Sequence, residues 1–288
     1  MSHQTLNASP AVPLRLLAAL MLSGALALTG CGGGSDAGTT AAPETAQEEE
    51  APAPLTEDEV KQWLDGVDSF VGRQATVTGQ VFNTEHDGDL HSYQIYTDPD
   101  NYEGNTIIQI SGENPGISNE DFIRATGTIE ENFTGENAFG GEVTATAMTA
   151  DTIEKVTYQE AVAPTLTQVD LSLAAETSGY SVTIDKIEFA EKETRVYVTL
   201  SNNGAGRFSM FDQDAVIIQD GQQYNVQDNY LAGYPSINNE LAQGASMSGI
   251  ICFPHLEAKN MQIQMHGFSD NYEVDPPSLD YTFDITIE

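Results

Sequence analysis

The chain of 288 residues carries 44 Asp and Glu against 10 Lys and Arg, which gives a formal net charge of -34 at pH 7. This charge excludes nucleic acid and anionic lipid headgroups as partners, because phosphate binding requires clustered Lys and Arg. The length leaves room for about two domains of ordinary size in addition to a leader and a linker.

A short apolar run over residues 16–28 ends in Leu28-Thr29-Gly30-Cys31, which looks like the lipobox of a bacterial lipoprotein signal peptide. The small residues before the cysteine fit a signal peptidase site, and the Cys31 thiol is the atom that would take the lipid. We therefore predict a signal peptide over 1–30 and attachment of diacylglycerol and palmitate to Cys31. The predicted location is the extracytoplasmic side of the cell membrane.

The residues that follow the apolar run favour this interpretation over a transmembrane helix. A membrane-spanning helix needs about 20 apolar residues, and the glycine-rich polar stretch from Gly30 onward cuts the run short. Residues 31–54 are acidic and of low complexity, without a large apolar side chain. They predict a disordered tether.

Residues 55–71 predict a short amphipathic helix. Thr56, followed by three acidic residues, is typical of a helix N-cap. Apolar residues then fall at helical spacing as far as about Phe70: Val60, Trp63, Leu64 and Val67. We expect Trp63 to pack the helix onto the β domain that follows, because burial is the commoner use of a tryptophan.

From Gly72 the apolar period changes to two, which predicts β-strands over 72–156. Two of the segments contain a glycine in mid-strand, Gly79 and Gly127, which allows a strand to bend within a curled sheet. Alternating segments bounded by turn residues predict a small five-stranded barrel or sandwich. These segments are 75–81, 93–96, 107–110, 123–129 and 143–148.

This region resembles the OB-fold domains of the anticodon-binding-like type found in bacterial surface lipoproteins. The resemblance implies a five-stranded barrel with a binding face for oligonucleotides or oligosaccharides. Arg73, Arg124 and Lys155 are the cations of residues 65–156, so the charge argues against nucleic acid here too. The resemblance rests on Val77–Val81, Tyr93–Ile95, Asn105–Ile108, Asp121–Ile129 and Gly140–Ala145.

Residues 157–177 show no sustained pattern and are predicted to be a linker. Alternation resumes over 178–288, where repeated short strands predict an antiparallel β-sandwich. The predicted class is therefore all-β throughout. The segments are 180–187, 194–200, 215–218, 247–253, 261–265 and 281–285.

The second half resembles the immunoglobulin-like domain of unknown function common in bacterial lipoproteins, which is similar in fold to the secreted mycobacterial immunoprotective antigen. The resemblance implies an Ig-like sandwich and assigns no functional residues. Its turn sequences favour positive φ, as in Asp220-Gly221. The resemblance rests on Val182–Glu188, Val196–Gly204, Asp220–Tyr224 and Leu241–Phe253.

Nucleophile candidates are weak in this sequence. Cys252 is the second cysteine beside Cys31, and its strand-like apolar surroundings predict a buried, inert thiol. The stretch around Ser246 superficially resembles a nucleophile elbow, but it lacks the glycine two residues after the serine and a strand-to-helix context. We expect no catalytic residues and no enzyme activity.

Three groups of acidic or histidine residues are candidate metal sites. Asp98–Gly104 has the spacing of an acidic turn rather than of a calcium loop, since Gln109 stands where a bidentate Glu is required. His86 and His91 flank a turn and could clamp a metal ion across a hairpin, although solvated loop histidines are commoner. The same applies to Asp212–Asp214, so we expect neither a metal nor a cofactor.

Three classes of function follow. The favoured one is a membrane-anchored, non-enzymatic module that binds an extracellular protein, glycan or small ligand. The alternatives are a structural or envelope-homeostasis lipoprotein without a ligand and a metal-dependent hydrolase. Aromatic residues in predicted loops support the first class. They are Tyr102, Phe133, Phe139, Tyr230 and Tyr234.

Overall fold

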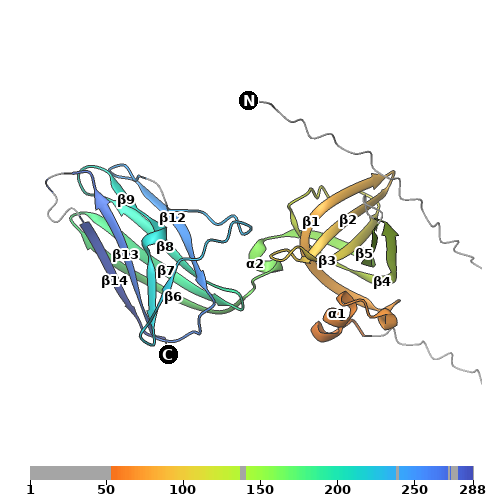
Figure 1. Cartoon of the computed structure of the whole chain (residues 1–288). Coiled ribbons are helices and arrows are strands. Elements are labelled where there is room, and N and C mark those ends of the chain that lie inside the picture. Colours follow the sequence, from red (N-terminus) through yellow and green to blue (C-terminus); the bar gives the residue numbers. More distant parts are fainter. Residues whose placement is uncertain (1–52, 137–140, 238–239, 272, 274–277, 288) are drawn as a thin grey trace, which may run out of the picture. The chain divides into compact units, whose positions relative to one another are not determined.

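The computed structural model describes residues 53–136, 141–237, 240–271, 273 and 278–287. The predicted signal peptide, the lipid attachment residue Cys31, nearly all of the predicted tether and Phe139 lie outside the described residues. Strands dominate the described parts and helices are few, which confirms the predicted all-β class (Figure 1).

The N-terminal helix α1 spans Glu57–Leu64 and begins where the sequence predicts. The Thr56 hydroxyl accepts a hydrogen bond from the backbone N–H of Glu59, and the Glu59 carboxylate accepts one from the backbone N–H of Thr56, which makes a capping box. The helix ends before Phe70 because Gly66 turns the chain with φ +91°, and a 3-10 turn η1 follows over Asp68–Phe70. Trp63 is buried in the barrel core, as predicted.

The five strands predicted in the first half all form, and they close into a barrel. Its strand order is β1-β2-β3-β5-β4, in which β3 and β5 run parallel and the other pairs run antiparallel. The strands are β1 Gln74–Asp87, β2 Leu90–Asp98, β3 Glu103–Ser111, β4 Phe122–Glu136 and β5 Glu142–Val156. Each is longer than its alternating segment.

The two mid-strand glycines stand where neighbouring backbones approach closely. A Cβ on Gly79 would lie 2.4 Å from the carbonyl oxygen of Tyr96, and one on Gly127 would lie 2.2 Å from that of Thr149. The β4–β5 ladder also shifts register between Thr126 and Gly127. A side chain at either position would push two strands apart, so both glycines are part of how the barrel closes.

The prediction of a linker over 157–177 is wrong. A short helix α2 forms over Tyr158–Ala161, and Thr165–Thr177 forms strand β6, which pairs with β7. β6 is an edge strand with mostly exposed side chains, and Ser172 interrupts it in a bulge with φ +64°. The bulge and the exposure remove the apolar alternation on which the prediction depended.

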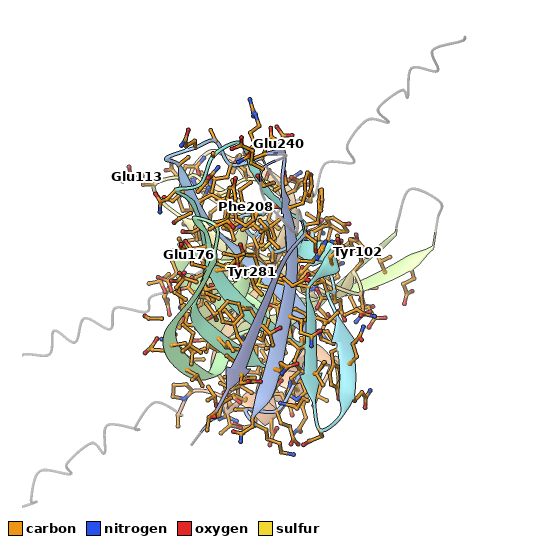
Figure 2. The ribbon with its side chains drawn as sticks, turned by 90° about the vertical axis from the view of Figure 1, so that its left-hand side faces the viewer. Tyr102, Glu113, Glu176, Phe208, Glu240 and Tyr281 are labelled. Carbon is orange, nitrogen blue, oxygen red and sulfur yellow. The ribbon has the colours of Figure 1, made fainter. Side chains whose placement is uncertain are left out.

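The second half forms two sheets with a shared core. One sheet has the order β12-β8-β7-β6, and the other has the order β11-β10-β13-β14 with β9 on β13. Figure 2 shows Phe208 and Tyr281 in the interior, where both are buried. The strands are β7 Tyr180–Ala190, β8 Glu193–Asn202, β9 Phe208–Met210, β10 Val216–Gln219, β11 Gln222–Asn225, β12 Ser246–Pro254, β13 Met261–Ser269 and β14 Ser278–Ile285.

The sequence does not predict strands β9 and β11. Strand β9 has three residues, too few to show a period of two, and the side chains of β11 are mostly exposed, so it shows no apolar alternation. The Asp220-Gly221 turn that joins β10 to β11 is confirmed, with φ values of +53° and +79°. Positive φ at both central residues matches the right-handed twist of the two strands.

Candidate functional site

A loop over 226–237 runs along the outer edge of β12. The backbone N–H of Gln227 donates to the carbonyl of Cys252, and the backbone N–H of Ile250 donates to the carbonyl of Pro235, each at 2.9 Å. Gly249 permits the close approach, since a Cβ there would lie 2.6 Å from Cγ2 of Ile237. Between its two points of attachment the loop is free to arch away from the strand.

The arch walls a cavity of about 340 Å³, which is within the size range of small-molecule sites. Its floor is strand β12, and one wall is the 3-10 turn η2 over Asp212–Asp214. The lining residues are Asp212, Gln213, Val226, Asp228, Asn229, Tyr230, Gly233, Tyr234, Ser236, Ile250, Ile251 and Cys252. The cavity therefore combines carboxylates, amides and phenols with an aliphatic floor.

Asp228 organises the mouth of this cavity. Its Oδ1 accepts a hydrogen bond from Nε2 of Gln213 at 2.7 Å, and its Oδ2 accepts one from the Tyr230 hydroxyl at 2.9 Å. Tyr230 is 88% exposed, so its ring faces solvent while its hydroxyl is tied to Asp228. An exposed aromatic ring held at a cavity mouth is available to contact a ligand.

Deeper in the fold, Glu193 at the start of β8 holds the cavity wall in place. Its carboxylate is buried and accepts hydrogen bonds from Asn229 Nδ2 at 2.7 Å and from the Cys252 thiol at 3.2 Å. The Tyr234 hydroxyl and Arg195 Nη1 donate to the same carboxylate. Two loop residues and one strand residue of the cavity are thus fixed by one buried anion.

Arg195 balances that anion and is itself completely buried. Its Nη1 lies 2.8 Å from Glu193 and its Nε lies 3.0 Å from Glu188, so one guanidinium bridges two glutamates. The remaining donors reach the carbonyl of Ala163 at 2.9 Å and the hydroxyl of Thr165 at 2.7 Å. A buried charge requires such complete pairing.

The pKa values follow from this network. Burial opposes ionisation of Glu193, but hydrogen bonds from Tyr234, Arg195 and Asn229 outweigh it and hold the pKa of the carboxyl below its ordinary value. Burial, and then the charge of Glu193, raises the pKa of the Cys252 thiol. The predicted burial of Cys252 is confirmed, and the thiol stays protonated at neutral pH.

The other nucleophile candidate lies in the wrong context. Ser246 is the first residue of strand β12 and is exposed. A nucleophile elbow requires a sharp turn from a strand into a helix. The structure therefore supports the sequence argument against a nucleophile at Ser246.

The candidate metal groups differ in their burial and in their hydrogen-bond partners. Asp98–Gly104 covers the turn between β2 and β3, where Asn101 Nδ2 donates to Asp98 at 2.8 Å, in agreement with an acidic turn. Asp212 is buried rather than solvated, because η2 folds it against the cavity, where Ser236 donates to it. Among the described residues, no group of three or more His, Cys, Asp or Glu is placed to hold a metal ion.

The sequence favoured solvated positions for both hairpin histidines, and the structure shows that this is wrong for one of them. His86 is exposed, but His91 is buried, because the β1–β2 register sets them opposite each other and His91 lies on the inner side of β2. The structure thus brings together two residues that the sequence could only place on either side of a turn.

Sequence reasoning missed Glu188, Glu193 and Arg195. One feature of the sequence could have indicated a buried ion pair. An arginine lies within the alternating segment 194–200, in a chain that has 10 Lys and Arg in total. Tyr230 and Tyr234, named as loop aromatics, do come together at the cavity. Tyr102 is exposed on the barrel, and Phe133 is half-buried in β4.

Comparisons with known proteins leave the family open. No family model matches the chain, and no curated protein matches it. A functionally unknown protein from Listeria monocytogenes is 13% identical, with a TM-score of 0.36, over 46% of this chain and 94% of the other. A conserved domain protein from Bacillus anthracis is 7% identical, with a TM-score of 0.29, over 72% of this chain and 90% of the other.

A third solved structure, from Bacillus subtilis, carries the name "putative lipoprotein (ycdA)". It is 14% identical, with a TM-score of 0.29, over 40% of this chain and 39% of the other. No helix in the described part of the chain combines the length and the apolar character that crossing a membrane would require.

Proposed function

We propose that this chain is a lipid-anchored lipoprotein on the extracytoplasmic side of the cell membrane, where it acts as a non-enzymatic binding module. The anchor is Cys31, and its support is the lipobox-like sequence that ends the apolar run over 16–28. The barrel is an OB-like domain and the sandwich is an Ig-like domain in this proposal. The strand order β1-β2-β3-β5-β4 and the two packed sheets support these assignments.

The observation that carries the binding role is the cavity of about 340 Å³ beside β12. Its walls are held by the buried Glu193 carboxylate and by the two backbone bonds that attach the loop over 226–237. A site built on a rigid support before the ligand arrives loses less entropy on binding. The cavity is therefore better suited to a ligand than a loop surface of the same composition.

Charge and hydrogen bonding limit the ligand class. Asp212 and Asp228 line the cavity, and no Lys or Arg is among the described residues that line it. Anionic ligands are disfavoured by this field, whereas hydroxyl and ammonium groups find acceptors. We propose a small neutral or cationic ligand, which Tyr230 contacts with its exposed ring.

A thermal-shift screen of the purified chain against neutral sugars and small amines tests the binding role. A true ligand should raise the melting temperature, and Asp228→Asn and Tyr230→Ala should each weaken its binding by about tenfold or more. Leu166→Ala, which removes an exposed side chain of β6 that is not among the described residues lining the cavity, is the control. If no compound shifts the melting temperature, or if the control variant loses binding equally, the structural-lipoprotein alternative replaces this proposal.

The anchor is tested separately by cell fractionation of Cys31→Ala. The variant should leave the membrane fraction, because lipid chains hold the wild-type chain there. Continued sedimentation of the variant with membranes would refute the lipid anchor without affecting the cavity proposal.

A further inference from the structure

The β1–β2 hairpin places two histidine rings against each other at one end of the barrel. His86 on β1 pairs with His91 on β2, and a tight turn through Gly88, with φ +61°, fixes their register. The two Nδ1 atoms lie 2.8 Å apart. Two imidazole nitrogens at this separation can both reach a single metal ion.

His91 is held in the orientation that a metal ligand needs. Its Nε2 lies 3.1 Å from the carbonyl oxygen of Gly112, and because a carbonyl can only accept, Nε2 must carry the hydrogen. In the neutral ring the lone pair is then on Nδ1, which faces His86. Donation of the second ring N–H to a backbone carbonyl is how proteins commonly orient metal-binding histidines.

The partner ring is free to adjust. His86 is exposed, whereas His91 is only 5% exposed, so a small rotation of His86 can open the pair. Zinc binds imidazole nitrogen at about 2.0–2.1 Å in tetrahedral geometry, which requires the two nitrogens to be roughly 3.3 Å apart. The edge of Tyr93, with ring centroids 6.1 Å from His86, limits how far that ring can turn.

The surroundings favour a cation. Glu85 and Asp87 flank His86 in sequence, and Asp89 lies in the same turn; all three are exposed. Their negative charges raise the local concentration of divalent ions. The described residues do not place a third His, Cys, Asp or Glu in a ligand group here, so we expect water to supply the further ligands of a bound ion.

We propose that His86 and His91 form an open two-histidine site for a divalent transition-metal ion that prefers imidazole nitrogen, such as Zn²⁺. The ion binds both Nδ1 atoms, and the proton that His86 shared between the rings moves through water to its own Nε2. This transfer leaves the number of protons on the two rings unchanged, so the binding step neither releases nor consumes a proton. This site is independent of the cavity beside β12.

Isothermal titration of the purified full chain with ZnCl₂ tests the proposal. We expect about one ion to bind per chain at this site, and His86→Ala and His91→Gln should each weaken that binding by about tenfold or more. His86→Ala changes an exposed side chain, so it keeps the test valid if His91→Gln destabilises the barrel. His266→Ala is the matched control, because His266 also pairs with a neighbour, Asp280, at 2.6 Å.

A competing titration with CaCl₂ separates imidazole from carboxylate ligands. Calcium prefers oxygen ligands, so an excess of it should leave the zinc binding unchanged. Equal binding by His86→Ala, equal loss in His266→Ala, displacement by calcium, or no zinc binding at all would each overturn the proposal.

Discussion

The barrel and the sandwich both carry exposed ion pairs, and the sandwich has a buried one in addition. In the barrel, Arg124 and Glu154 meet at 2.8 Å with 35% and 62% of their side chains exposed. In the sandwich, Arg195 has no exposed surface and bridges two buried glutamates. Water screens the first pair and cannot screen the second. Contacts of similar length therefore have very different consequences when one partner is removed.

Arg195→Met should produce the largest effect. The substitution leaves the buried Glu193 without its cation and leaves Glu188 with Lys186 alone, which should cost about 3–5 kcal/mol of unfolding free energy. Arg124→Met is the matched control in the barrel and should cost about 0–1 kcal/mol. Urea denaturation measures both, and equal costs would remove the contrast between the two regions.

The single tryptophan assigns each transition to a region. Trp63 is buried in the barrel core, so its fluorescence reports on barrel unfolding. Tyrosine signals in near-ultraviolet circular dichroism also report on the sandwich, where Tyr180 and Tyr281 are buried. Arg195→Met should shift the second signal more than the first.

Low pH should weaken the ion pairs that Glu188 and Glu193 form with Arg195, because it protonates the two carboxylates. The pKa values of Glu188 and Glu193 are below the ordinary value of 4.5, because hydrogen bonds outweigh the opposing effect of burial. A lowered folded-state pKa gives stability that is complete above the unfolded-state pKa and is lost as the pH falls through the folded-state value. We expect the sandwich to weaken as the pH falls below about 4.5. Glu193→Gln should flatten this dependence in urea titrations at several pH values, and an unchanged slope would contradict the assignment.

Gly127→Ala tests the close backbone approach in the barrel. Its Cβ would meet the backbone of Thr149 and Ala150, which cannot turn aside, so the expected cost is about 1–3 kcal/mol in the Trp63 fluorescence transition. Gly135→Ala is the control, since the atoms nearest to its Cβ would belong to the Phe133 ring, a side chain that can rotate. A larger loss of unfolding free energy in Gly135→Ala than in Gly127→Ala would show that the strands at Gly127 can accommodate a Cβ.

Thr56→Ala should give the smallest effect. Loss of the cap on α1 should cost about 1 kcal/mol in the same fluorescence transition. Thr56→Ser keeps a hydroxyl that can accept from Glu59 and should stay within a few tenths of a kcal/mol of the wild type. If the two variants lose equal stability, the cap is not the cause.

The sequence predicted elements that bury one face and missed those that do not. Five barrel segments alternate because one side of each faces the core, whereas β6 is exposed and bulged, so its pattern disappears. The cap at Thr56 could be predicted because it is local. The contacts among Glu188, Glu193 and Arg195 depend on strand register, and those from Asn229 and Tyr234 depend on the path of a loop. Neither is encoded in local spacing.

The loop over 226–237 also affects whether neighbouring copies can pair along the edge of β12. An open sheet edge offers unpaired N–H and C=O groups to any neighbouring strand and so invites edge-to-edge aggregation. On β12 the carbonyl of Cys252 and the N–H of Ile250 are already bonded within the chain. A strand of a second copy therefore cannot form a continuous ladder of backbone hydrogen bonds with β12. For a protein that is concentrated on a membrane surface, as we propose, this blocked edge keeps neighbouring copies from joining their sheets through β12.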